Sequence, residues 1–414
     1  MSKRTLLWMG DAAVASGFAR CTHNTLKEFV DTWDVHVLGL NYTGDPHEQP
    51  FKIYPAWSGG DAFGLNRVAG LINKIQPDAI IVQNDPWNIP AYLKKIGDEI
   101  PVIAVMPVDG KNCQGSKLNS LKLAIFWTDF AIDEARKGGY TGKAAVVPLG
   151  VDLNIYMPTD RKVARANVGL PEGLEDVFIV GNINRNQPRK RLDLSIRYFC
   201  EWLKNYDIQD AYLFLHICPT GDQGFDVSQL MSYYGLANRL IIAEPDIGQG
   251  VPEHLVVETY NAFNIQISTT QGEGWGLTQM EGMACGIPQI APNWAALGDW
   301  AKDAAYLVPC TETAVTPNFV NILGGVPDRL LFIEALDLFY REETLRKSYT
   351  EKGFDLVKRS EFNWKNIGTK FRNVVEEALF SNVMIHPARG TFPVDGINSA
   401  IDKLNSKLGI SDGV

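Results

Sequence analysis

The sequence predicts an α/β protein built from two doubly wound, Rossmann-like domains that face a central cleft. Short apolar runs rich in β-branched residues alternate with longer helical segments along most of the chain. This alternation is typical of parallel sheets covered by helices on both faces. Because 414 residues exceed one ordinary hydrophobic core and the alternating pattern occurs twice, we expect two such domains.

Strand-like runs and helical segments alternate in both halves of the chain. Strand-like runs of the first half lie at residues 6–9, 35–40, 80–83, 102–106, 123–127 and 146–147, and helical segments at 19–30, 66–75 and 130–137. Strand-like runs of the second half lie at residues 177–181, 212–217, 240–243, 265–268, 289–291 and 305–308. Residues 327–380 are strongly helical, with a break near 360–363.

A linker between the domains is predicted at residues 157–173, because Pro158, Pro171 and several charged residues suit an exposed connection. We therefore assign residues 1–165 to an N-terminal domain and residues 170–360 to a C-terminal domain. The polar residues 383–414 contain scattered prolines and glycines and form either a loose tail or a strap.

Composition excludes some classes of function. The net charge of -9 argues against loose electrostatic binding to nucleic acid or to an anionic membrane. Residues 1–165 carry 18 Lys and Arg against 17 Asp and Glu, so this part is neutral and the acidic excess lies in the rest. The scattered cysteines and the lack of a signal-like or membrane-spanning stretch favour a cytoplasmic protein without stable membrane association.

The strongest motif follows the strand-like run 265–268. Glu273 and Glu281 are separated by seven residues among glycines that let backbone N–H groups approach a ligand. A helix that begins near Leu277 would point its amino end at the same place. The Glu281 carboxylate suits the two hydroxyls of a ribose, and the Glu273 carboxylate suits sugar hydroxyls; a glycine turn with an acidic helix start is the structural alternative. The candidate ligand-binding residues are Glu273, Gly274, Trp275, Gly276, Leu277 and Glu281.

A basic motif follows the strand-like run 177–181. Four basic residues, Arg185, Arg189, Lys190 and Arg191, fall within seven positions at a strand-to-helix turn. Arginine offers a planar fork to phosphate oxygens and lysine a point charge, which together suit a diphosphate. A solvated helix start is the alternative, but positive charge there opposes the helix dipole.

Two loops of the first half are weaker candidates. Ser16 and Gly17 follow the first strand-like run, and backbone donors there suit a phosphate or an acceptor, although a plain strand–helix connection is the alternative. Asp109 follows the run 102–106 and suits a group that orients or deprotonates an acceptor hydroxyl, although a turn aspartate beside glycine is equally expected. The next loop contains Lys111, Lys117 and Lys122 and no acidic residue.

These motifs, in this order, resemble those of the retaining GT-B glycosyltransferases of the family four type. The block 273–288 is similar to the family's most diagnostic signature, and Arg185 and Lys190 have the spacing of its diphosphate-binding pair. Residues 147–152 look like its interdomain stretch and residues 16–18 like its first glycine loop. Residues 362–364 look like the start of its last helix, at about 363–380, which in the family crosses back to the first domain.

The resemblance implies a nucleotide-diphosphate sugar held mainly by the second domain. It implies Arg185 and Lys190 on the diphosphate, Glu281 on the ribose, Glu273 with nearby amides on the transferred sugar, and Gly17 beside the donor. It also implies a hexosyl- or pentosyltransferase that retains the anomeric configuration and needs no metal or other cofactor, in keeping with the lack of an Asp-x-Asp pair. The family's first-domain histidine has no clear equivalent, and Asp109 is the nearest candidate.

The acceptor and two other functions stay open. Residues 293–300 look similar to virus-encoded members, which would place the protein in a host cytoplasm and make a hydroxymethylated DNA base a candidate acceptor. A soluble glycan or a small hydroxyl compound is equally compatible. We expect the acceptor on residues 1–165, near Ser16, Asp109, Lys111 and Lys117. The alternatives are a sugar-nucleotide epimerase of the same fold that uses Asp11 and Asp109, or a binding protein with a decayed site.

Overall fold

The computed structural model describes residues 3–14, 16–217, 224–236, 238–243, 251–317 and 320–380. The chain separates into a compact unit, Met1–Leu379, and a second unit, Phe380–Val414. The tail or strap predicted at residues 383–414 lies outside the described residues. No helix among the described residues has the length and apolar character needed to cross a membrane.

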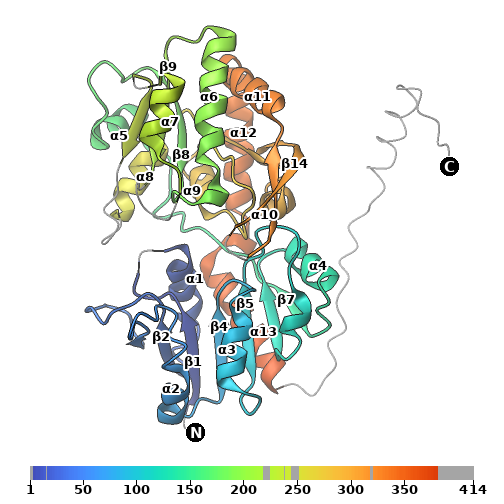
Figure 1. Ribbon diagram of the computed structural model, residues 1–414. Coiled ribbons are helices and arrows are strands. Elements are labelled where there is room, and N and C mark those ends of the chain that lie inside the picture. The colour runs from blue at the N-terminus through green and yellow to red at the C-terminus, as the bar shows by residue number, and fades with distance from the viewer. Residues whose placement is uncertain are drawn as a thin grey trace, which may run out of the picture. The chain divides into compact units, whose positions relative to one another are not determined.

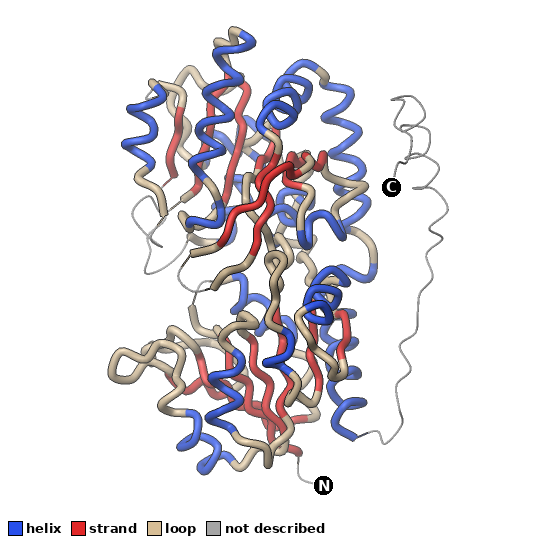
Figure 2. Tube along the Cα trace, turned by 45° about the vertical axis from the view of Figure 1, so that its right-hand side comes forward, coloured by secondary structure: helices blue, strands red, loops and turns tan. Residues whose placement is uncertain are grey.

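The first sheet has seven parallel strands in the order β3-β2-β1-β4-β5-β6-β7 (Figures 1 and 2). The strands are β1 Arg4–Gly10, β2 Trp33–Gly39, β3 Lys52–Pro55, β4 Ala79–Gln83, β5 Val102–Met106, β6 Leu123–Phe126 and β7 Ala144–Val146. The connecting helices are α1 Gly17–Leu26, α2 Val68–Ile75, α3 Ile89–Ile96, the 3-10 helix η1 Gly115–Leu118 and α4 Asp129–Lys137. Strands β4 and β5 are buried along their whole length, as expected for a sheet covered on both faces.

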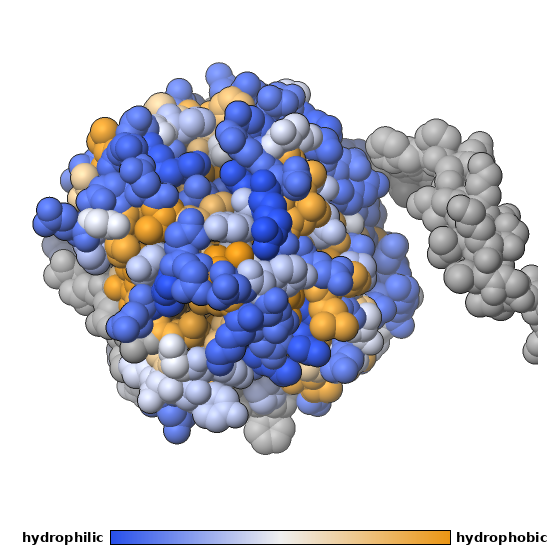
Figure 3. All heavy atoms as spheres, turned by 90° about the horizontal axis from the view of Figure 1, so that it is seen from above, coloured by the Kyte–Doolittle hydropathy of each residue, from blue (hydrophilic) through white to orange (hydrophobic). Residues whose placement is uncertain are grey.

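The second sheet has six parallel strands in the order β10-β9-β8-β11-β12-β13. The strands are β8 Phe178–Ile183, β9 Ala211–His216, β10 Leu240–Ala243, β11 Ile265–Ile267, β12 Gln289–Pro292 and β13 Tyr306–Val308. Its helices are α5 Arg161–Asn167, η2 Pro188–Lys190, α6 Leu192–Tyr206, α7 Val227–Tyr234, α8 Glu253–Asn261, α9 Leu277–Ala284, α10 Ala295–Trp300, α11 Arg329–Arg341 and α12 Glu343–Val357. An antiparallel hairpin, β14 Cys310–Val315 and β15 Leu323–Pro327, follows β13. From its outer end this domain shows hydrophobic groups scattered among hydrophilic ones (Figure 3).

The chain returns to the first domain through η3, Ser360–Phe362, and α13, Trp364–Phe380. The ring of Phe371 on α13 packs against Trp8 of β1 and Phe29, at centroid distances of 6.0 Å each. The Trp33 indole N–H donates to Glu376 at 3.1 Å. These contacts make α13 part of the cover of the first sheet (Figure 1).

Helix α5 belongs with the second sheet. The Arg165 guanidinium donates to the Ala262 carbonyl at 3.0 Å and to the Asn264 side chain at 2.8 Å. The predicted end of the first domain at residue 165 therefore falls inside a second-domain helix, and the connection between the domains ends before Arg161. The prediction failed there because the linker composition extends into the first turn of α5, whose Asp160 caps it.

Candidate active site

Loops that follow the strands of the two sheets meet one another. Asp109 follows β5 of the first domain, and its carboxylate lies 3.4 Å from Arg189, which follows β8 of the second domain. Gly272 lies so close that a Cβ there would sit 1.6 Å from the Asp109 carbonyl oxygen. In parallel α/β sheets ligands bind beyond the carboxyl ends of the strands. The candidate site therefore lies where the strand ends of both domains converge.

Lys190 and Glu273 form a buried ion pair at the centre of this contact. The Lys190 Nζ lies 2.5 Å from Glu273 Oε1, and the two side chains are only 9% and 7% exposed. Arg189 lies 3.4 Å from the second oxygen of Glu273 and donates to the Gly272 carbonyl at 2.8 Å. Although burial opposes it, Lys190 and Arg189 hold the pKa of Glu273 below its ordinary value. Glu273 is thus an anion held by two cations.

Asp109 is in contact with the glycine loop of the second domain. A Cβ on Gly274 would lie 2.2 Å from Pro107 Cβ and 3.1 Å from Asp109 Oδ1, so only glycine permits this approach. The Gly274 backbone N–H interacts with the Asp109 carboxylate. Burial raises the pKa of Asp109, and Arg189 opposes the rise. The predicted acceptor-side carboxylate therefore lies at the loop predicted to bind the sugar.

Two more carboxylates of the first domain lie beside Asp109. Asp11 follows β1 and Asp85 follows β4, and the order β1-β4-β5 places the three strand ends side by side. Burial and the nearby Asp109 carboxylate raise the pKa of Asp85 to about 7. Asp11 accepts hydrogen bonds from Ser16 Oγ at 2.7 Å and from Asn41 Nδ2 at 3.1 Å. Asp85 carried no signal in the sequence beyond its place two residues after a strand.

Arg185 is exposed and lies at the same edge. Its charge lowers the pKa of Asp11, although burial raises that pKa overall. Arg185 therefore lies near the Asp11 carboxylate, whereas Lys190 pairs with Glu273. The two predicted diphosphate ligands thus act on different carboxylates, Arg185 on Asp11 and Lys190 on Glu273.

Glu281 lies on α9 and is 4% exposed. Tyr260 donates its hydroxyl proton to Glu281 Oε2 at 2.8 Å, and Arg20 of the first-domain helix α1 forms an ion pair with Oε1. Arg20 also lies 3.5 Å from Glu253, whose carboxylate accepts a hydrogen bond from Tyr156 at 3.0 Å. Arg20 is a site residue that the sequence did not indicate, because an arginine on an amphipathic helix is ordinary.

The amino end of α9 faces the first glycine loop. Gly276 precedes the helix with φ of 98°, and a Cβ on Gly17 would lie 3.2 Å from the Leu277 side chain. Ser16 caps α1 by accepting the Ala19 N–H at 3.0 Å. The side chain of Trp275 is buried and stacks on Trp300, so only its backbone can face a donor.

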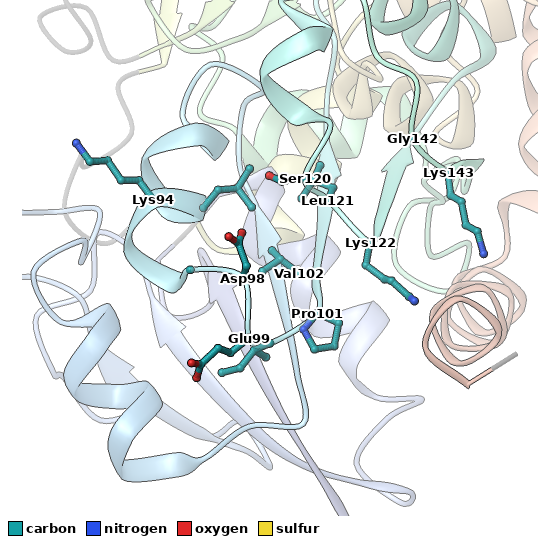
Figure 4. A pocket seen from close by; sticks show the side chains of 13 residues that line it. Lys94, Asp98, Glu99, Pro101, Val102, Ser120, Leu121, Lys122, Gly142 and Lys143 are labelled. Atoms are coloured by element: carbon teal, nitrogen blue, oxygen red, sulfur yellow. The ribbon is translucent and has the colours of Figure 1, made fainter. Parts of the chain in front are cut away.

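The lysines predicted beside Asp109 do not gather there. Lys111 Nζ lies 4.7 Å from the centre of the Trp294 ring, and Lys117 lies on η1, which packs against α3 and α4. Lys122 directly precedes β6 and lines a pocket at the amino ends of β5 and β6 with Lys94, Asp98 and Glu99 (Figure 4). Lys122 lies at the opposite edge because β6 is parallel to β5, so the chain must cross the sheet between them, whereas Lys111 stays two residues after Asp109.

Comparison with known proteins agrees with this arrangement. Residues 160–315 match the family described as Glycosyl transferases group 1. A D-inositol 3-phosphate glycosyltransferase of Nocardia farcinica is 31% identical over 208 residues, 48% of this chain and 44% of that protein. The corresponding protein of Rhodococcus jostii is 32% identical over 204 residues, 48% and 43% of the two chains. The matches span less than half the length of these relatives.

Solved structures match over most of the chain. Sucrose-phosphate synthase from Thermosynechococcus elongatus has a TM-score of 0.72 with 16% identity, covering 91% of this chain and 99% of that one. Anabaena HepE, solved in complex with UDP and glucose, has a TM-score of 0.66 with 14% identity, covering 90% and 100%. Residues 160–315 are therefore similar to the Glycosyl transferases group 1 family, within a chain that shares the two-domain GT-B fold of these structures.

Proposed function

We propose that the chain is a retaining, metal-independent glycosyltransferase that moves a sugar from a nucleotide-diphosphate sugar to an acceptor hydroxyl. The observation that carries this proposal is the convergence of Lys190, Arg189 and Glu273 with Asp109 across two Rossmann-like domains. It brings two cations and two carboxylates together within one site, which supports the roles proposed for them below. Relatives named as glycosyltransferases, and HepE with its bound UDP and glucose, support the class of donor.

In this proposal the second domain holds the donor. Arg185 and Lys190 bind the diphosphate and stabilise its charge as the bond to the sugar breaks, which is the task a metal ion performs elsewhere. Glu273 and the amides of the Gly274–Gly276 loop bind the transferred sugar. Glu281 accepts the ribose hydroxyls, since a carboxylate has about four lone-pair sites and Tyr260 and Arg20 occupy two.

The state of the carboxylates bears on how the proposed retention would be reached. A covalent double displacement needs a carboxylate that is free to attack the anomeric carbon. Asp109 and Glu273 both lie 3.4 Å from Arg189, and Glu273 is also paired with Lys190, which reduces their nucleophilicity. We therefore propose attack by the acceptor on the face from which the diphosphate leaves.

For the acceptor we propose an uncharged, hydroxyl-rich molecule, a soluble glycan or a small polyol. Asp11, Asp85 and Asp109 lie on the first-domain side of the site, where their oxygens can hydrogen-bond to hydroxyl groups and any of them that is ionised repels phosphate. A hydroxymethylated DNA base gains no support from the lysines, because Lys117 and Lys122 lie away from the strand ends at Asp109.

The test screens labelled nucleotide sugars against glycans, polyols and hydroxymethylcytosine DNA, with the product anomer assigned by NMR. We expect transfer to a polyol or glycan with retained configuration. Arg185→Ala should lower kcat/KM by about 2–4 kcal/mol of transition-state stabilisation. An inverted product refutes the mechanism, glycosylated DNA refutes the acceptor class, and isomerised donor formed without any acceptor identifies an epimerase instead.

A further inference from the structure

The β14–β15 hairpin of the second domain pairs with the first-domain loop that carries Asp109. The Lys111 N–H donates to the Leu323 carbonyl at 3.0 Å, and the Leu323 N–H donates to the Lys111 carbonyl at 3.0 Å. The Asn112 side chain adds a hydrogen bond to the Asn321 carbonyl at 2.8 Å. The first residue of β15 thus forms an antiparallel bridge to the first domain, two residues after Asp109.

Close backbone packing holds this bridge on both sides. A Cβ on Gly110 would lie 2.4 Å from the Leu323 carbonyl oxygen, and a Cβ on Gly324 would lie 2.4 Å from Gln271 Cβ. The Gly325 N–H donates to the Gln271 carbonyl at 2.7 Å, and the Gln271 N–H donates to the Arg189 carbonyl at 2.8 Å. The hairpin therefore lies between the Asp109 loop and the loop that leads into Glu273.

A side-chain contact adds to the bridge. The Lys111 ammonium lies 4.7 Å from the centre of the Trp294 ring, and Trp294 also packs against Gly325. A lysine over an indole face is attracted by the ring quadrupole. Backbone and side chain of Lys111 are therefore both held by the second domain.

We infer that the hairpin positions Asp109 against the Gly274 loop, so that the acceptor hydroxyl rather than water meets the transferred sugar. Leu323, Lys111 and Asn112 are positioning residues in this inference, because they act through Asp109. This inference rests on the proposed transferase function. In it, the hairpin is the part of the chain that favours transfer over hydrolysis.

The two competing reactions differ only in the attacking oxygen. In transfer, the acceptor oxygen bonds to the anomeric carbon, the bond from that carbon to the diphosphate oxygen breaks, and the acceptor proton passes to the departing diphosphate. In hydrolysis, water supplies both the oxygen and the proton. A displaced Asp109 no longer orients the acceptor hydroxyl, so the share of hydrolysis rises.

The test compares Leu323→Pro with Leu323→Ala. Both shorten the side chain, but only proline removes the N–H that donates to Lys111. We expect Leu323→Pro to raise the ratio of hydrolysis to transfer about three- to tenfold, the factor that one net hydrogen bond is worth. Leu323→Ala should keep the wild-type ratio, and titration with UDP, GDP and ADP should give unchanged affinities in both.

If Leu323→Pro fails to fold, a second variant tests the same inference. Asn112 has φ of 73°, which glycine adopts without strain, so Asn112→Gly removes the hydrogen bond to Asn321 and keeps the backbone. It should shift the same ratio in the same direction. A ratio equal to wild type in every folded variant overturns the inference, whereas a wild type that neither transfers nor hydrolyses any nucleotide sugar overturns the proposed function instead.

Discussion

Replacing Lys190 by methionine isolates the buried ion pair of the candidate site. Methionine keeps the length of the side chain and removes the charge that lies 2.5 Å from Glu273. Glu273 is 7% exposed and would keep only Arg189, at 3.4 Å, as a cationic partner. Breaking a buried pair from one side costs about 3–5 kcal/mol, and the remaining arginine places the expected loss at about 3 kcal/mol.

The double variant Lys190→Met, Glu273→Gln shows whether the loss comes from an uncompensated charge. When both charges are removed, no buried anion is left to desolvate. We therefore expect the double variant to be more stable than the sum of the single losses by about 1–3 kcal/mol. Urea denaturation followed by circular dichroism gives the free energies of unfolding, provided that the slopes agree between variants.

Exposed Lys204 on α6 provides the matched control. Lys204→Met makes the same chemical change in the same domain and should alter the free energy of unfolding by less than about 0.5 kcal/mol. Losses for Lys190→Met and Glu273→Gln that add within about 0.5 kcal/mol in the double variant would show that the two charges are not coupled, and would refute the reasoning.

Three other predictions concern pH, the donor and metals. Burial holds the pKa of Asp85 at about 7, above its ordinary value of 3.8, so folding stability falls as pH rises through this window. The melting temperature of Asp85→Asn should therefore exceed that of wild type by more at pH 8 than at pH 5, and an equal difference at both pH values contradicts this. Arg20→Met removes the cation that occupies Glu281 and should lower the Kd of the donor nucleotide in calorimetric titration, whereas weaker binding would mean that Arg20 contacts the nucleotide. Activity should survive excess chelator, and a loss restored by manganese would contradict a metal-independent reaction.

Most strands of the two sheets were predictable from their apolar runs, and in strands such as β4, β5 and β8 these runs are buried along their whole length. Elements that are only half buried escaped prediction. Strand β3, Lys52–Pro55, lies at the sheet edge and begins with an exposed lysine. Strand β14, Cys310–Val315, is largely exposed and alternates too weakly to be distinguished from a loop. Sequence patterns mark segments that are buried, and β3 and β14 contain only half-buried and exposed residues.

The residues of the candidate site also differ in whether the sequence could predict them. Asp109, Glu273 and Lys190 were predicted together because the ends of parallel strands converge, which is a property of the fold class. The pairing of Arg20 with Glu281 joins residues 261 positions apart and depends on how the two domains sit against each other. No local pattern encodes that placement, so the sequence could not indicate it.

The stacked tryptophans beneath the glycine loop give the protein a built-in optical reporter. Trp275 and Trp300 lie 5.1 Å apart with their rings 15° from parallel, and the Trp300 N–H donates to the Trp275 carbonyl at 2.7 Å. Both rings contact Phe362, which directly precedes the return to the first domain. Two indoles this close couple their electronic transitions, so a shift of the loop at Gly274 or of α13 changes the circular dichroism and fluorescence of this pair. If binding of a nucleotide sugar moves this loop, the binding can be followed without any label.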